Sequence, residues 1–96
     1  MARTTSKQLI KRKKVIFKFV SPGSKSVSLV GNFNDWDQKR HPMQNDGNGL
    51  WSKTVMLPKG SHQYKFLVDN QWMQDPDNDK LAPNEFGTHN NVIDVA

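Results

Sequence analysis

The sequence contains no cysteine and no long apolar run. Without cysteine, a disulfide framework, a thiolate metal site and a cysteine nucleophile are all excluded, and the composition fits a reducing compartment. No stretch approaches the roughly 18 apolar residues that would predict a membrane-spanning helix. The amino-terminal segment also lacks the apolar centre of a secretory signal peptide. We therefore expect a soluble, cytoplasmic protein that does not associate with membranes.

Acidic residues are missing from the first 18 positions, which hold seven basic residues. The whole chain has 14 basic and nine acidic residues, so residues 19–96 carry seven basic and nine acidic residues, a net charge of −2. We predict that residues 1–12 form a basic, disordered arm and that residues 13–96 form the folded domain. Nucleic-acid binding through the basic run at 11–14 is disfavoured, because basic arms are common on proteins that never bind nucleic acid.

Apolar residues at helical spacing are also lacking over any span of three turns. Alternating apolar and polar residues instead predict strands at about 13–20, 26–31, 50–57, 62–69 and 91–95, with a short segment at 71–73. Turn residues separate these strands, above all the Asp-Gly-Asn-Gly run at 46–49. Six or seven short strands at intervals of about ten residues predict an all-β fold, an immunoglobulin-like antiparallel β-sandwich.

The strand predicted at 62–69 has two chemically different faces. Tyr64, Phe66 and Val68 occupy alternate positions, so they share the face that packs into the core. Lys65 therefore lies on the opposite, outer face of the sheet.

The three tryptophans differ in their surroundings. Trp51 opens a strand on the same face as apolar residues, and we predict that it belongs to the core. Trp36 has polar neighbours in the loop 31–38, where Phe33 is the better candidate to anchor the loop, and Trp72 follows the turn at 69–70. Each of the latter two alone fits a lid over the core as well as an exposed platform. Together, with amide and basic side chains nearby, they predict a carbohydrate site, because a sugar ring stacks on an indole while amides and amines bind its hydroxyls.

Four motifs occur in order: the run 27–36 ending in Asn-Asp-Trp, the segment 57–69 containing His-Gln-Tyr-Lys-Phe, Trp72 with the Asp-Pro pair at 75–76, and the segment 87–93. They resemble the glycogen-binding domain of AMP-activated protein kinase β subunits. That domain belongs with the family 48 carbohydrate-binding modules, which also precede the catalytic domains of isoamylases and branching enzymes. The resemblance covers about residues 13–96 and implies a sandwich of the early-set type.

The resemblance also implies which residues contact the sugar. Two tryptophans flank it, a lysine binds hydroxyls, an apolar residue fits the curve of the helical glucan, and a threonine and an asparagine add polar contacts. In this order these residues are Trp36 and Trp72, Lys65, Phe86, Thr88 and Asn90. Phe86 stands where the family usually has leucine.

No catalytic or metal site is predicted. Asp75, Asp77 and Asp79 alternate as in a calcium loop, but the glycine and glutamate that an EF-hand requires are not at their offsets. The three histidines are scattered, and a glycosidase needs two carboxylates across a cleft that a sandwich of this size does not offer. We therefore expect neither enzymatic activity nor a cofactor.

The leading hypothesis is non-catalytic binding of α-1,4-glucan such as glycogen, starch or a maltooligosaccharide. The alternative is a regulatory or scaffold protein that docks a kinase or a glycogen-metabolising enzyme. A shallow platform supports modest affinity, on the order of −4 to −8 kcal/mol or millimolar to micromolar dissociation constants.

Overall fold

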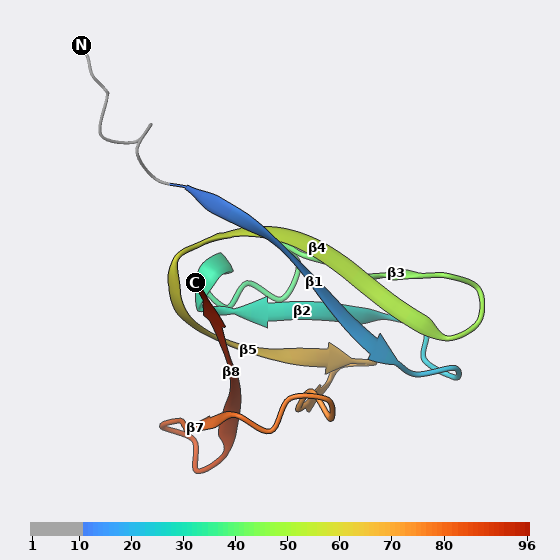
Figure 1. The fold of residues 1–96 in the computed structure, drawn as a ribbon. Coiled ribbons are helices and arrows are strands. Elements are labelled where there is room, and N and C mark those ends of the chain that lie inside the picture. Colours follow the sequence, from blue (N-terminus) through green and yellow to red (C-terminus); the bar gives the residue numbers. More distant parts are fainter. Residues whose placement is uncertain (1–10) are drawn as a thin grey trace.

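A computed structural model describes residues 11–96. This part of the chain contains eight β-strands, one short 3-10 helix and no α-helix (Figure 1). The elements are β1 (Arg12–Val20), β2 (Val27–Gly31), η1 (Asn32–Asn34), β3 (Gln44–Asn45), β4 (Leu50–Pro58), β5 (Gly60–Val68), β6 (Gln71–Met73), β7 (Leu81–Pro83) and β8 (His89–Val95). No helix within residues 11–96 is long and apolar enough to cross a membrane. Of the predicted arm, residues 1–10 lie outside the described residues, and β1 begins at Arg12.

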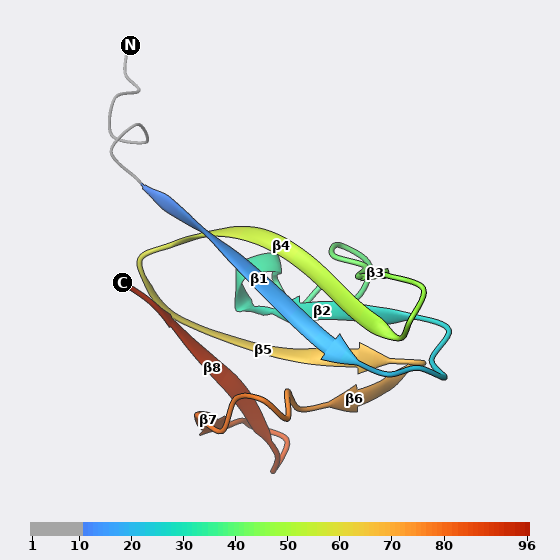
Figure 2. The same cartoon turned by 45° about the vertical axis from the view of Figure 1, so that its right-hand side comes forward.

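The strands form two antiparallel sheets. The smaller sheet has the strand order β1-β4-β3, and the larger has the order β2-β5-β8-β7 with β6 also paired to β5. Figures 1 and 2 both show β1 passing across β2 at an angle, with its partner β4 beside it. β5 organises the larger sheet because it pairs with three strands, β2, β6 and β8. The predicted all-β, antiparallel β-sandwich is confirmed.

Aromatic contacts between the sheets form the core. Phe17 of β1 meets Tyr64 of β5 edge to face with ring centroids 4.8 Å apart, and Phe19 meets Phe66 at 5.0 Å. Such pairs stabilise a core beyond the area they bury. Trp51 is buried as well, and its indole N–H donates to the carbonyl of Ser21 at 3.1 Å, so the prediction that it is a core residue is confirmed.

The five long predicted strands agree with the structure to within two residues at each end. Two very short strands, β3 and β7, were not predicted, because two or three residues are too few to show an alternation. The turn predicted at 46–49 joins β3 to β4, with Gly47 at φ 94° and Gly49 at φ 91°. These angles favour glycine.

Buried and partly exposed side chains alternate along β5, so the strand has an inner and an outer face. Tyr64, Phe66 and Val68 are buried, whereas Lys65 and Leu67 are only partly covered. The predicted faces of this strand are therefore confirmed, and the outer face of β5 is available to support a site.

Candidate functional site

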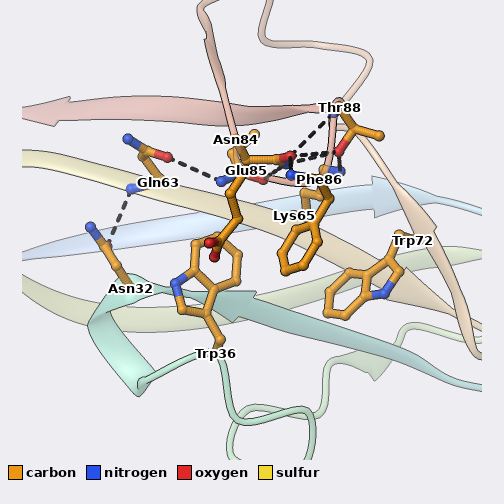
Figure 3. A pocket seen from close by; sticks show the side chains of 10 residues that line it. Asn32, Trp36, Gln63, Lys65, Trp72, Asn84, Glu85, Phe86 and Thr88 are labelled. Atoms are coloured by element: carbon orange, nitrogen blue, oxygen red, sulfur yellow. Dashed lines mark hydrogen bonds between the residues drawn. The ribbon is translucent and has the colours of Figure 1, made fainter.

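A shallow depression of about 810 Å³ lies beside the outer face of β5 (Figure 3). Four separate parts of the chain supply its side chains: η1 with the loop after it, β5, β6, and the connection from β7 to β8 with the start of β8. Its lining includes all six predicted residues, Trp36, Lys65, Trp72, Phe86, Thr88 and Asn90. It also includes four that were not predicted, Asn32, Gln63, Asn84 and Glu85. The fold thus brings the predicted residues together from positions 54 residues apart in sequence, Trp36 to Asn90.

Trp36 stands on a tightly wound loop. Asp35 and Trp36 both have left-handed backbones, with φ 58° and 56°, and the Trp36 N–H donates to the carbonyl of Gly31 at 2.9 Å. Two consecutive non-glycine residues in this region persist only where the surrounding structure holds them. The result is an indole that is 38% exposed and faces the depression (Figure 3).

Asn34 holds this loop from below. Its side chain is 1% exposed and makes three hydrogen bonds. Asn34 Oδ1 accepts from the N–H of Gly31 at 3.0 Å, and Nδ2 donates to the carbonyl of Leu29 at 3.1 Å and to His41 Nδ1 at 2.7 Å. A buried amide with every partner in place gives the loop a single geometry.

His41 serves as an acceptor in this arrangement only while its ring is neutral. Burial lowers the pKa of His41 below its ordinary value of 6.5, and the positive charges of Lys53 and Arg40 lower it further. The neutral ring is thus favoured where the Asn34 bond needs it.

Trp72 lies on β6, directly opposite Leu67 of β5. It follows a turn in which Asp69 and Asn70 have φ 48° and 67°. The Asp69 carboxylate fixes this turn by accepting from the backbone N–H groups of Lys25 and Ser26 at 2.8 and 2.9 Å. Trp72 is 46% exposed, and Figure 3 shows its indole on the same side of the depression as that of Trp36.

Lys65 extends from β5 to the far wall of the depression. Its Nζ donates to Thr88 Oγ1 at 3.0 Å. The ammonium group retains two further N–H donors for a ligand.

Asn84 organises the loop that carries Phe86 and Thr88. Its Oδ1 accepts from the backbone N–H of Phe86 at 2.9 Å and of Thr88 at 3.2 Å, while its Nδ2 donates to Thr88 Oγ1 at 2.8 Å and to Asn90 Oδ1 at 2.9 Å. The loop also turns through Gly87 at φ 79°, which favours glycine. One side chain therefore positions three of the six predicted contact residues.

Asn90 supports the depression mainly through hydrogen bonds to neighbouring side chains. It is only 7% exposed, and besides accepting from Asn84 it donates from Nδ2 to Gln63 Oε1 at 3.0 Å. The N–H of Gln63 in turn donates to Asn32 Oδ1 at 3.2 Å. A chain of amides thus joins the loop 84–88 to the segment beside Trp36.

Phe86 is the most exposed large apolar side chain among the described residues, at 81%. Figure 3 shows its ring projecting from the loop into the space between the indoles of Trp36 and Trp72. An apolar ring held in solvent between two exposed indoles is typical of a binding surface.

Comparison with known proteins adds a family. The family model described as the glycogen recognition site of AMP-activated protein kinase matches residues 13–96. The chain belongs to this family. The resemblance predicted from the four sequence motifs is confirmed.

Three curated relatives are each 41% or 42% identical in sequence to this chain. The β-1 subunit of 5'-AMP-activated protein kinase from Sus scrofa is 42% identical over 73 residues, covering 76% of this chain and 57% of that protein. The β-1 subunit from Bos taurus is 42% identical over 73 residues, and the β-2 subunit from Mus musculus is 41% identical over 75 residues. The chain spans 26% of the cattle protein and 27% of the mouse protein.

Some residues that build the depression or support it were not revealed by the sequence alone. Asn34 and Asn84 act through partners that the fold supplies, although the Asn-Glu-Phe-Gly spacing at 84–87 is a turn signal that could have marked Asn84. Glu85 lies in the depression with no motif pointing to it. Within residues 11–96 no cluster of three potential metal ligands occurs. Asp75 instead accepts from the hydroxyl of Tyr64 at 2.7 Å and from the N–H of Asp77 at 2.9 Å.

Proposed function

We propose that this domain binds α-1,4-glucan without catalysis, with glucose units stacked on Trp36 and Trp72. The observation that carries the proposal is the pair of exposed indoles facing one depression, with Phe86 projecting between them. Membership of a glycogen recognition family supports the class of ligand.

The stacking follows from the chemistry of the sugar. The C–H face of a glucose ring is apolar and packs on an indole, while its hydroxyl groups point outward along the ring edge. Two platforms set on different segments suit a chain that curves from one glucose unit to the next. Phe86 fills the inner side of that curve.

The polar contacts come from the wall opposite the tryptophans. Lys65 donates from its free N–H groups. The Thr88 hydroxyl holds that ammonium group in place, because it accepts from Lys65 and from Asn84 Nδ2 and donates to Asn84 Oδ1 at 3.1 Å. Asn90, which is almost completely buried, supports this wall and offers little surface of its own. The polar groups are already held by hydrogen bonds within the protein, so little side-chain entropy is lost when the sugar binds.

Affinity electrophoresis in gels that contain glycogen tests the proposal. We expect the wild type to be retarded, and Trp36→Ala and Trp72→Ala each to lose at least about tenfold in affinity, or ~1.4 kcal/mol. Met56→Ala is a matched control, because Met56 is exposed on the opposite sheet and is also large and apolar. Pull-down with cellulose controls for linkage type. Unretarded migration of the wild type contradicts the proposal.

We also propose residues 13–96 as the binding unit and residues 1–12 as an arm that the glucan does not touch. The arm holds basic residues, so any contact that it makes with an anionic partner weakens as salt rises. Removal of residues 1–10 is expected to leave glycogen retention unchanged at every salt concentration. A loss of retention after this truncation contradicts the assignment.

A second proposal concerns partners. The relatives are named as β subunits of a kinase, and this chain spans at most 57% of the length of the Sus scrofa, Bos taurus and Mus musculus proteins. We propose that the domain works together with a kinase or a glycogen-metabolising enzyme. Co-purification from amylase-treated extract, with the Trp36→Ala/Trp72→Ala double variant as bait, excludes bridging through glycogen. An identified kinase subunit or glycogen enzyme that remains bound supports the proposal, and loss of both contradicts it.

A further inference from the structure

The depression holds one acidic side chain, Glu85, and one basic side chain, Lys65. Glu85 lies between Asn84 and Phe86 on the loop that Asn84 fixes, so its backbone is held from both sides. Figure 3 shows its carboxylate directed toward the indole of Trp36. Lys65 is directed instead toward Thr88.

Glu85 has no cationic partner in the described part of the chain. Within residues 11–96 the only ion pair joins Lys80 to Asp94. The Glu85 side chain is exposed, and no hydrogen bond from residues 11–96 to its carboxylate occurs. Its charge and its acceptor oxygens therefore face whatever occupies the Trp36 platform.

A carboxylate accepts hydrogen bonds and donates none. The hydroxyl groups along the edge of a glucose unit stacked on Trp36 can donate to it. A phosphoryl group on the same unit carries between one and two negative charges at neutral pH, and it is repelled by a carboxylate. A carboxylate at the Trp36 end of the depression therefore favours a hydroxyl over an anion.

We propose that Glu85 is a specificity-determining residue that makes the Trp36 platform select uncharged glucose units over phosphorylated ones. This inference rests on the proposed glucan-binding function. It gives Glu85 and Lys65 opposite tasks, because the carboxylate can only accept hydrogen bonds from the ligand and the ammonium can only donate them.

The test compares two forms of one ligand, a phosphorylated maltodextrin pool and the same pool after phosphatase treatment. Calorimetry at low ionic strength gives the ratio of the two affinities for each protein. We expect the wild type to prefer the dephosphorylated pool, and Glu85→Gln to reduce that preference by roughly three- to tenfold, the effect of one exposed charge at short range. Glu85→Lys is expected to reduce it further. Asp79→Asn is the matched control, because Asp79 is an exposed acid outside the depression.

The outcomes separate the two proposals. If the wild type fails to bind even the dephosphorylated pool, the glucan-binding function itself is wrong. If the wild type binds that pool but shows no preference, or if Glu85→Gln keeps the wild-type preference, the role of Glu85 is wrong while glucan binding stands. An equal change in Asp79→Asn also overturns the inference, because net charge alone then explains the effect.

Discussion

Lys65 Nζ donates a hydrogen bond to Thr88 Oγ1 at 3.0 Å, although 23 residues separate the two in sequence. This contact ties the central strand β5 to the loop that carries Phe86. The Thr88 hydroxyl also accepts from Asn84 Nδ2 at 2.8 Å. The same oxygen is therefore bonded both to β5 and to the start of the loop.

Thr88→Val keeps the shape of the side chain and removes the hydroxyl, and with it the bonds to Lys65 and Asn84. We expect glucan affinity to fall by about three- to tenfold, because Lys65 loses its orientation, while the free energy of unfolding changes by less than ~1 kcal/mol at this exposed position. Calorimetry with β-cyclodextrin measures the affinity, and urea unfolding measures the stability. Thr54→Val on the exposed face of β4 is the matched control. Equal affinities for Thr88→Val and wild type would show that the bond has no part in binding.

Asn84 is predicted to act as a positioning residue. Asn84→Ala removes both the acceptor for the loop N–H groups and the donor to Asn90, and we expect at least tenfold weaker binding of β-cyclodextrin. Asn84→Asp keeps the acceptor and loses the donor, so its affinity should fall between those of the wild type and the alanine variant. Asn48→Ala, in the exposed turn before β4, controls for loss of an amide. Identical affinities for the Asp and Ala variants would contradict the role of the retained acceptor.

Asn34→Ala is predicted to damage both the fold and the Trp36 platform. The substitution leaves the N–H of Gly31 and the carbonyl of Leu29 without their buried partners, and we expect a loss of about 2–4 kcal/mol in the free energy of unfolding. Urea denaturation followed by tryptophan fluorescence measures it. At temperatures where the variant remains folded, its glucan affinity should also be reduced. A variant as stable as the wild type would show that the three bonds are not needed.

The pH dependence of stability should reveal His41. Because its pKa is lowered in the folded protein, the unfolded chain binds more protons at pH values between the folded pKa and 6.5, and stability rises with pH through this window. The contribution is complete above pH 6.5 and is lost as pH falls through the folded pKa, when the protonated ring no longer accepts from Asn34.

His41→Asn preserves an acceptor for Asn34 and removes the titration. Acidification from neutral pH should therefore destabilise the wild type more than the variant, by less than about 1 kcal/mol because the ring is only partly buried. Urea unfolding at several pH values gives both curves. If stability depends on pH in the same way in both proteins, His41 is not the cause of the acid destabilisation.

The sequence predicted the parts of this fold that depend on alternation. Tyr64, Phe66 and Val68 face the core and Lys65 faces outward because a strand exposes its residues in turn, and Trp51 is buried for the same reason. The six contact residues were predicted from the resemblance to the family to which the chain belongs, and all six line one depression.

The missed features depend on partners that only the folded chain supplies. Asn34 is a polar residue in a polar loop, and nothing in its neighbours shows that it is buried with all its hydrogen bonds satisfied. Glu85 is one acid among nine, and its significance comes from the indole of Trp36 toward which it points. The short strand β7 exists because β8 lies beside it, since three residues cannot persist as a strand alone.

Four segments far apart in the chain meet at the depression. One of them is β5, and the other three are attached to it by strand pairing, directly or through β8, or by the hydrogen bond from Gln63 to Asn32. Under the proposed function, a bound glucan is therefore a removable cross-link. The glucan joins segments that move independently in the unfolded chain. The unfolded chain offers no such binding site, so the glucan binds only the folded state. At a free concentration 100 times its dissociation constant, such a ligand contributes about 2.7 kcal/mol to the stability of the folded state. If the domain binds glucan as proposed, abundant polysaccharide protects it against unfolding, and depletion of the polysaccharide leaves the same chain easier to unfold and degrade.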